Sequence, residues 1–138
     1  IDGTFTAVSI SPLELVLEGF AVLCHAWLPA AKLLLGCEGG ELLIADSRTG
    51  ALLRTARQHP AWRELGLPVC ALLAHRAHVL AATQDGVLRF FAHPKWDAVQ
   101  EDLTLLHETT IATSEEEELE VTSMVYSPLY NMVVIATS

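Results

Sequence analysis

The feature that most constrains the fold of this chain is a pattern that occurs three times along it. Each occurrence consists of an apolar run, a turn and a second apolar run with the length and composition of a β-strand. Aligning Cys24, Cys70 and Ser123 places the occurrences 46 and 53 residues apart. A four-stranded propeller blade repeats every roughly 40–45 residues before loop insertions are added. The spacing therefore predicts a β-propeller.

Short turns separate the apolar runs. In the second repeat Asp85 and Gly86 lie between two such runs, which is the strongest short-range signal for a β-hairpin. The first repeat has comparable turns at 38–40 and 47–50. The expected strands cover residues 21–29, 32–37, 41–46, 51–55, 69–74, 78–83, 87–91, 120–128 and 132–137.

The N-terminal residues fit the same frame. An Asp-Gly pair at positions 2–3 matches the turn of the second repeat, so residues 4–11 are expected to form the third strand of a blade and residues 13–18 the fourth. A competing alignment compares residues 7–12 with the first strand of the third repeat. It leaves only seventeen residues before the next such strand ends, too few for a blade, so we favour the first frame.

The expected fold class is all-β: a partial β-propeller made of four-stranded antiparallel blades, with about twelve strands and no helix longer than two turns. Its two outermost strands are apolar edges, so the chain alone is expected to aggregate. The expected domain map runs as follows: residues 1–19 are the last two strands of a preceding blade, 20–58 a complete blade, 59–68 a loop insert, 69–113 a complete blade with an insert at 92–102, and 114–138 an acidic loop and the first two strands of a further blade.

Composition excludes several classes of protein. Hydrophobic residues make up 51% of the chain and charged residues 18%, which is typical of a packed core and excludes a disordered chain. The net charge of −9 leaves no basic stripe for nucleic acid and disfavours an anionic membrane surface. The chain has three cysteines and no CxxC pair, so neither a disulfide framework nor a zinc knuckle is indicated. This favours a reducing compartment.

Residues 20–37 are mostly apolar over eighteen positions and resemble a membrane-spanning helix in composition. However, His25, Pro29 and Lys32 lie near the middle of the stretch. A central lysine costs about 3 kcal/mol on an insertion scale, and an interior proline breaks a helix. We therefore expect two strands joined by a turn, and no membrane insertion.

No residue pattern supports catalysis or a cofactor. His25, His75 and His78 could be combined on paper with Cys24 or Cys37 as metal ligands, but their spacing is not that of a zinc site. The serines lack a nucleophile elbow, and no phosphate-binding loop is present. We expect no catalytic residue, no cofactor and no metal.

Several short motifs resemble those of the WD-repeat β-propeller family. Residues 46–50 are similar to its Asp-x-x-Thr-Gly turn, residues 127–128 to the Ser-Pro that follows a first strand, and residues 36–40 and 82–86 to its second hairpin. The family's Gly-His and Trp-Asp pairs are missing in register, so the resemblance is to a degenerate member. It implies a scaffold that binds proteins through stiff loops on two rims.

Within that family, residues 24–29 followed by 36–43 resemble the large cilia- and flagella-associated WD-repeat scaffold proteins. That resemblance implies a non-catalytic structural component of the ciliary or flagellar axoneme, in the cytoplasm or cytoskeleton, with other proteins of a large complex as partners. It carries over no functional residue. The alternatives are a WD-repeat adaptor in membrane traffic or ubiquitin-ligase assembly and, in a different class, part of a propeller hydrolase.

The candidate partner-binding residues lie in loops. Tryptophans beside cations occur in two proline-flanked inserts and are typical interface anchors, whereas Trp27 continues a strand and is expected in the core. An acidic run favours a basic partner and should be repelled by the acidic microtubule wall, so we expect no direct contact with the lattice. The candidates are Trp62, Arg63, Lys95, Trp96, Glu115, Glu116, Glu117 and Glu118.

Overall fold

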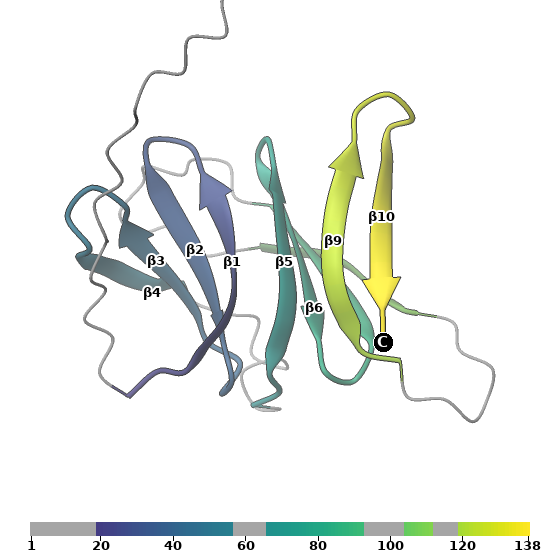
Figure 1. Cartoon of the computed structure of the whole chain (residues 1–138), viewed down its shortest axis with the longest axis horizontal. Helices are drawn as coiled ribbons and strands as arrows, with labels where there is room; N and C mark the ends of the chain where they lie inside the picture. The colour runs from purple at the N-terminus through teal and green to yellow at the C-terminus, as the bar shows by residue number, and fades with distance from the viewer. Residues whose placement is uncertain (1–18, 57–65, 93–103, 112–118) are drawn as a thin grey trace, which may run out of the picture.

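The computed structural model describes residues 19–56, 66–92, 104–111 and 119–138, and ten antiparallel strands in three sheets (Figure 1). The first two sheets have four strands each, in the orders β1-β2-β3-β4 and β5-β6-β7-β8, and the third is the hairpin β9-β10. The strands are β1 (Val22–Leu28), β2 (Lys32–Cys37), β3 (Leu42–Asp46), β4 (Leu52–Ala56), β5 (Val69–His75), β6 (His78–Thr83), β7 (Val87–Ala92), β8 (Thr104–Thr110), β9 (Val121–Ser127) and β10 (Met132–Thr137).

The all-β prediction is confirmed. Strands β2, β6 and β10 have the expected bounds, and β1, β3, β4, β5, β7 and β9 differ by one residue at one or both ends. No range was predicted for β8. Ala92, expected to begin an insert, is the last residue of β7. Residues 20–37 form β1, a turn and β2, and the described parts of the chain contain no helix. The strands expected over 4–11 and 13–18 lie outside the described residues.

One backbone hydrogen bond recurs in all three sheets. The N–H of Glu38 donates to the Ala21 carbonyl (2.8 Å), that of Gln84 to Pro68 (3.1 Å), and that of Ser138 to Glu120 (2.9 Å). The acceptors lie 47 and 52 residues apart in the sequence. The repeat is therefore real, but its register differs by one residue at its second occurrence.

The residue equivalent to Cys24 and Ser123 is Ala71, because it pairs with Ala82 as Cys24 pairs with Gly36. The predicted alignment on Cys70 was wrong. In each first strand the register shifts just after the initial valine, and Cys70 is the residue within that β-bulge. Matching one cysteine to another hid the shift.

The three sheets stack side by side, and their first strands β1, β5 and β9 are neighbours (Figure 1). In the second sheet and the hairpin, we call the surface that looks toward the preceding sheet the front face and the other surface the back face. In the first sheet the back face is the one that looks toward the second sheet, and the front face is the opposite one. The back face of the first sheet packs on the front face of the second in one buried cluster. Its members are Ala26, Leu28, Leu34, Leu42, Ile44, Val69, Leu72, Val79, Ala81 and Phe91.

The second sheet packs on the hairpin in the same way. Side chains of its back face and of the front face of the hairpin form another buried cluster, made of Ala71, Leu80, Ala82, Leu88, Val121 and Met124. Alternate residues of β5 thus serve two different neighbours, as the two-residue period of a strand requires. This arrangement is the radial packing of propeller blades.

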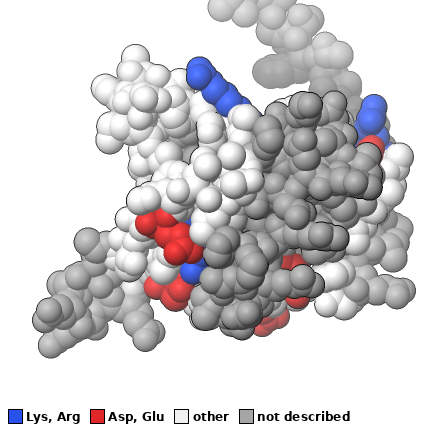
Figure 2. Space-filling view, turned by 180° about the vertical axis from the view of Figure 1, so that it is seen from behind, with Lys and Arg blue, Asp and Glu red and all other residues white. Residues whose placement is uncertain are grey.

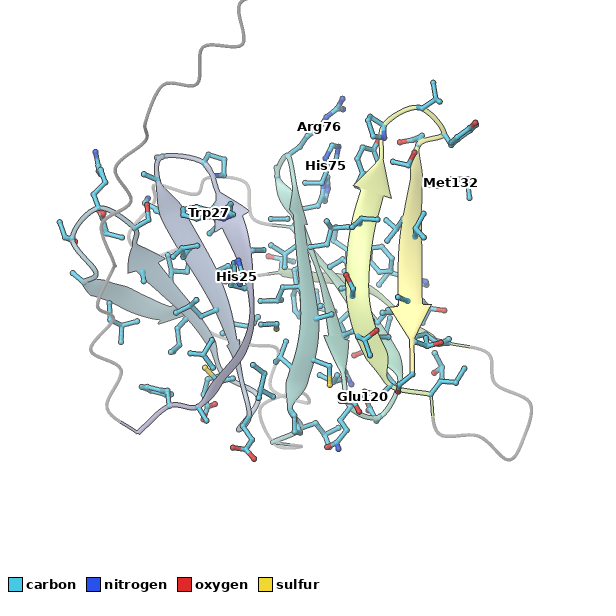
Figure 3. The ribbon with its side chains drawn as sticks, in the orientation of Figure 1. His25, Trp27, His75, Arg76, Glu120 and Met132 are labelled. Carbon is cyan, nitrogen blue, oxygen red and sulfur yellow. The ribbon has the colours of Figure 1, made fainter. Side chains whose placement is uncertain are left out.

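Trp27 lies on the front face of β1 and is 63% exposed, so its expected place in the core was wrong (Figure 3). The residue pairs with Leu33 in register, and the strand alternation points it away from the second sheet. Trp27 lies on a strand as predicted, but on the face of β1 that looks away from the second sheet. Leu33, Leu35 and Leu43 on this front face are buried with Phe20.

Two hairpin turns of the first sheet are joined to each other. Ala30 and Ala31, between β1 and β2, both have left-handed backbone conformations, with φ of 59° and 56°. The Ala31 carbonyl accepts hydrogen bonds from the Ser47 N–H (2.8 Å) and the Ser47 Oγ (2.6 Å) in the turn after β3. The two turns are therefore fixed side by side at one end of the sheet.

Candidate functional site

The ends of the strands form two rims that differ in charge. One rim carries the β2–β3 and β6–β7 turns. In and beside these turns the described residues include four acids, Glu38, Glu41, Asp85 and Glu120, whereas the nearby Arg89 is buried. We call this end the acidic rim. Figure 2 shows acidic side chains gathered over the lower half of the molecule, with one basic side chain among them. Such a surface favours a basic partner.

The opposite rim carries the β1–β2, β3–β4, β5–β6 and β9–β10 turns. Lys32, Arg48 and Arg76 lie at these strand ends and turns, and we call this end the basic rim. Basic side chains stand at the upper end of the molecule in Figure 2, and Arg76 projects from the upper end of β5 in Figure 3. The two rims thus present opposite charges to partners.

An apolar recess of about 150 Å³ opens at the basic rim, between the second sheet and the hairpin. At one side the His75 ring lies against the Tyr126 ring, with centroids 3.9 Å apart and planes tilted by 32°. The Tyr126 hydroxyl donates to Asn131 Oδ1 at 2.6 Å, which orients the ring. The lining residues are Leu73, His75, His78, Val79, Leu80, Phe90, Tyr126 and Val133.

Sequence reasoning missed this recess. His75 follows Ala71 and Leu73 at the two-residue period of β5, so the pattern places it on the back face of the second sheet. Tyr126 follows Met124 on the front face of the hairpin by the same rule. What the sequence does not state is that these two faces meet.

A carboxylate fixes the β3–β4 turn on the basic rim. Asp46 Oδ1 accepts hydrogen bonds from the N–H groups of Arg48 (2.8 Å) and Thr49 (3.3 Å), and the Arg48 guanidinium lies 3.5 Å from Oδ2. The Arg48 N–H is the main cause that lowers the pKa of Asp46 below its usual value. This is the turn whose sequence resembles the WD-repeat turn, and its acid has a structural role.

Arg89 carries a buried charge inside the second sheet, near the acidic rim. Its Nε donates to Glu108 Oε1 (2.8 Å), its Nη1 donates to Thr83 Oγ1 (2.5 Å), and its Nη2 lies 3.8 Å from Asp85 Oδ2. The Thr83 hydroxyl donates in turn to Asp85 Oδ1 (2.5 Å). The network joins β6, β7 and β8, and its polar groups bind one another, so it stabilises the sheet.

The three cysteines are free thiols. Burial raises the pKa of Cys24 to about 12, helped by the nearby Cys70. Burial also raises the pKa of Cys37 to about 11, and burial together with Glu120 raises that of Cys70 to about 11. Because the thiolate is the nucleophile and the metal-binding form, these sites are poorly suited to either role near neutral pH.

No group of three or more potential metal ligands occurs among the residues whose positions the structure gives. His25 is on the front face of β1, whereas the Cys24 thiol donates to the Val69 carbonyl on the back face (3.1 Å). His75 is engaged with Tyr126. The histidine and cysteine combination considered from the sequence is therefore not assembled.

The eight candidate contact residues lie outside the described residues. The strand ends on either side of them are described. Those flanking residues 57–65 and 112–118 are at the acidic rim, because Ala56 pairs with Leu42 and the Ile111 N–H donates to the Gly86 carbonyl (3.0 Å). Those flanking 93–103 are at the basic rim, because Ala92 pairs with His78.

Over the same described residues, none of the secondary structure is a helix with the length and apolarity needed to cross a membrane. The apolar stretch 20–37 is accounted for by β1 and β2.

No protein-family model matches this sequence, and no curated protein matches it. Two computationally designed proteins, Ika4 and Ika8, match in structure with TM-scores of 0.42, at 14% and 16% identity. Those matches cover 94% and 89% of this chain, and 99% and 45% of the designed chains. Their TM-scores are too low to assign a shared fold.

The crystal structure of the Cps50 (Swd1) β-propeller domain from Myceliophteria thermophila matches with a TM-score of 0.62 at 20% identity, over 86% of this chain and 35% of that one. The chain thus spans about a third of that domain. At this identity the likeness establishes the fold alone. Together with the stacked sheets and their recurring register, it identifies the fold of this chain as a partial β-propeller.

Proposed function

We propose that this chain is part of a WD-repeat β-propeller that acts as a non-catalytic scaffold and holds other proteins at its rims. The observation that carries the proposal is the apolar recess at the basic rim, beside the stacked rings of His75 and Tyr126. Its volume of about 150 Å³ suits one or two apolar side chains of a partner. Apolar pockets flanked by aromatic rings are typical anchor sites in protein interfaces.

The chemistry of the described residues supports binding over catalysis. A nucleophile or general base must be close to its partner and have a pKa suited to its task. The thiols have pKa values raised far above neutrality, and Arg89 is held by its own sheet. Side chains at the rims can make contacts with a partner without further change.

We propose the ciliary or flagellar axoneme as the setting, on the strength of the resemblance of residues 24–29 and 36–43 to the cilia-associated scaffolds. The partners would be other proteins of a large axonemal complex. The acidic rim is unsuited to the acidic microtubule wall, so the proposed contacts are with proteins other than the lattice. The division into blades at 20–58 and 69–113 is part of the same proposal.

The eight loop residues remain proposed partner contacts. The segment with Trp62 and Arg63 and the segment with the four glutamates join strand ends of the acidic rim, and that with Lys95 and Trp96 joins strand ends of the basic rim. They are therefore assigned to separate partner sites. The recess adds a contact at the basic rim that the sequence did not suggest.

A photo-crosslinking experiment tests the scaffold role. A benzophenone amino acid would replace His78 at the recess, Gln84 on the acidic rim or, as a control, Leu106 on the outer strand β8. We expect discrete protein adducts from the two rim positions and none from Leu106. Equal adduct patterns at all three positions would contradict rim-specific binding.

A separate experiment tests the setting. The tagged protein should follow the axoneme by fluorescence microscopy and remain with it after detergent extraction. Staining of vesicles or ubiquitin-ligase assemblies instead would favour the adaptor alternative and leave the scaffold role standing.

A further inference from the structure

The turn between β9 and β10 carries an apolar tip, made of Leu129 and Tyr130. These side chains are 81% and 70% exposed, the highest values among the large apolar side chains that the structure describes. A turn needs residues that permit its backbone, and here Pro128 and Asn131 supply them, Asn131 with a φ of 51°. It needs neither a leucine nor a tyrosine. The folding of the turn therefore does not account for the apolar tip.

A turn at this place is open to solvent even when its sheet has a neighbour on each side. The β5–β6 turn occupies the same place in the second sheet, which packs on the first sheet and on the hairpin. Arg76 in that turn and His78 directly after it are nevertheless exposed. The β9–β10 turn, over 128–131, is longer than the β5–β6 turn, over 76–77, and it projects further from the molecule (Figure 1). The exposure of the apolar tip is therefore a property of this rim.

A series of contacts fixes the β9–β10 turn relative to Arg76. The Tyr126 hydroxyl donates to Asn131 Oδ1 (2.6 Å) and so holds the last residue of the turn. The Tyr126 ring lies against the ring of His75, with centroids 3.9 Å apart. Arg76 directly follows His75 and projects beyond the upper end of β5, next to β9 (Figure 3). The apolar tip and the guanidinium thus belong to one preformed part of the basic rim.

Arg76 has a backbone conformation that its side chain does not favour. Its φ of 53° lies in the left-handed region, which residues other than Gly, Asn and Asp rarely adopt. A glycine would make the same turn without strain, and strained positions cluster where a protein binds its ligands. The arginine adds a planar cation that can hold a carboxylate through two parallel hydrogen bonds.

The charge of this rim favours an acidic partner. Lys32, Arg48 and Arg76 lie on it. The carboxylate described on the same rim, that of Asp46, accepts two backbone hydrogen bonds within its own turn and lies 3.5 Å from the Arg48 guanidinium. Complementary charge at a rim of this kind attracts an acidic segment and repels a basic one.

We propose that the apolar tip and Arg76 together bind an acidic segment of a partner protein that carries one apolar side chain. That side chain packs on Leu129 and Tyr130, and a neighbouring carboxylate accepts hydrogen bonds from the Arg76 guanidinium. The inference rests on the proposed scaffold role and gives the chemistry of one partner. Tyrosine and arginine dominate the energetics of protein interfaces, and a surface fixed before binding loses little entropy on contact.

Fluorescence anisotropy with a defined probe tests the proposal. The probe is a labelled synthetic peptide in which one leucine stands among aspartates and glycines, and it is titrated with the full chain. We expect saturable binding that weakens as salt is added. A peptide with lysines in place of the aspartates, or with serine in place of the leucine, should bind at least about tenfold more weakly. No binding of the acidic leucine peptide, or equal binding of the lysine peptide, would overturn the proposal.

Variants locate the binding site. Leu129→Ala or Tyr130→Ala should weaken the probe by about tenfold. Arg76→Glu should weaken it similarly and strengthen the lysine peptide, a reversal that loss of structure would not produce. Arg48→Glu makes the same charge change on another turn of this rim, and Leu106→Ala removes an exposed apolar side chain from β8. Both controls should stay within about twofold of the wild type. Far-UV circular dichroism checks that each variant keeps its β-structure.

The outcomes separate this site from the scaffold role. Equal losses from Arg76→Glu and Arg48→Glu, or no loss from the two variants of the apolar tip, would overturn the site. The scaffold role would still stand if His78 and Gln84 gave their crosslinked adducts. Absence of those adducts would contradict the scaffold role, whereas the charge reversal at Arg76 would still support the site.

Discussion

The two four-stranded sheets have the same backbone and different interiors. Both have the bulge after the first valine, the same pairing of four strands, and the same hydrogen bond that closes the second strand. Yet Leu43 in the first sheet is replaced by Arg89 in the second, at the same register position. The first position is buried among apolar side chains, and the second holds a charged network.

The difference shows that a propeller sheet tolerates a charged side chain in place of a buried apolar one. A guanidinium can replace a buried leucine because Thr83, Asp85 and Glu108 are there to bind it. In the first sheet the equivalent positions hold Cys37, Gly39 and Thr55, which could not. Backbone pairing thus sets the architecture. Each interior can be apolar or charged, provided that every buried polar group in it has a partner.

The largest expected effect comes from breaking the charged interior alone. Arg89→Leu copies the first sheet at one position and leaves two carboxylates without their partner, so the free energy of unfolding should fall by about 3 kcal/mol. The carboxylates are partly exposed, which keeps the loss at the low end of the range. Urea denaturation at one fixed protein concentration measures it.

The complete transplant is the control for that variant. Thr83→Cys, Asp85→Gly, Arg89→Leu and Glu108→Thr together give the second sheet the residues of the first. Apolar replacement of a whole buried ionic network is often neutral, so this variant should come within about 1 kcal/mol of the wild type. A quadruple variant as unstable as the single one would show that the two interiors are not interchangeable.

The next largest effect tests the contact between the first and second sheets. Gly36→Ala places a Cβ 2.6 Å from Cys24 Sγ and 2.7 Å from Val69 Cγ1, where the equivalent Ala82 already carries one. Overpacking of this kind should lower the free energy of unfolding by about 2 kcal/mol, measured by urea denaturation. Gly39→Ala is the matched control, since the three atoms nearest its Cβ all belong to the flexible Glu41 carboxylate, and it should change stability by less than about 0.5 kcal/mol.

Alkaline pH should lower the stability contributed by the first sheet more than that contributed by the second, and this effect is smaller than the previous two. Cys37 of the first sheet is fully buried with its pKa raised to about 11, and Thr83 stands at that place in the second. Its neutral thiol supports folding fully below pH 9, the usual thiol pKa, and this contribution is lost as pH rises toward 11. Between pH 8 and 10, the free energy of unfolding of the wild type should fall by about 1 kcal/mol more than that of the Cys37→Ala variant. Identical pH profiles would contradict the assigned burial.

The smallest effect concerns the turns that end the third strands. Asp46 stabilises the β3–β4 turn as a carboxylate, and the equivalent residue of the second sheet is Ala92. Because the pKa of Asp46 is lowered, its contribution is present above its usual pKa of 3.8 and is lost as pH falls below it. Asp46→Asn should therefore reduce stability slightly at pH 7 and not at pH 2, in thermal melts. A loss of equal size at both values would mean that the charge is unimportant.

Most of the strand pattern followed from the sequence. The Asp-Gly and Gly-Gly turns and the apolar runs between them located every described strand except β8 to within one residue at each end, because hairpins depend on local residues. The repeat also predicted the stacking of sheets. Both are consequences of period and turn chemistry that nearby residues determine.

What the sequence did not predict depends on which faces meet. Trp27 and Tyr126 have equivalent positions, but only Tyr126 has a neighbouring sheet described against it. The Arg89 network needs β6, β7 and β8 together, and β8 follows the other two after a long break in the pattern. Nor could a cysteine alignment reveal a bulge, since the extra residue shows only in the pairing.

The joined turns at the basic rim affect the entropy of binding. Left-handed backbone at alanine costs about 1 kcal/mol per residue, and Ala30 and Ala31 both adopt it. In exchange the Ala31 carbonyl meets Ser47, so two turns move as one body. The loss of freedom that a mobile loop would undergo on meeting a partner has then already occurred during folding. A rim organised in this way binds with a smaller entropic penalty, and its specificity comes from a shape that exists before the partner arrives.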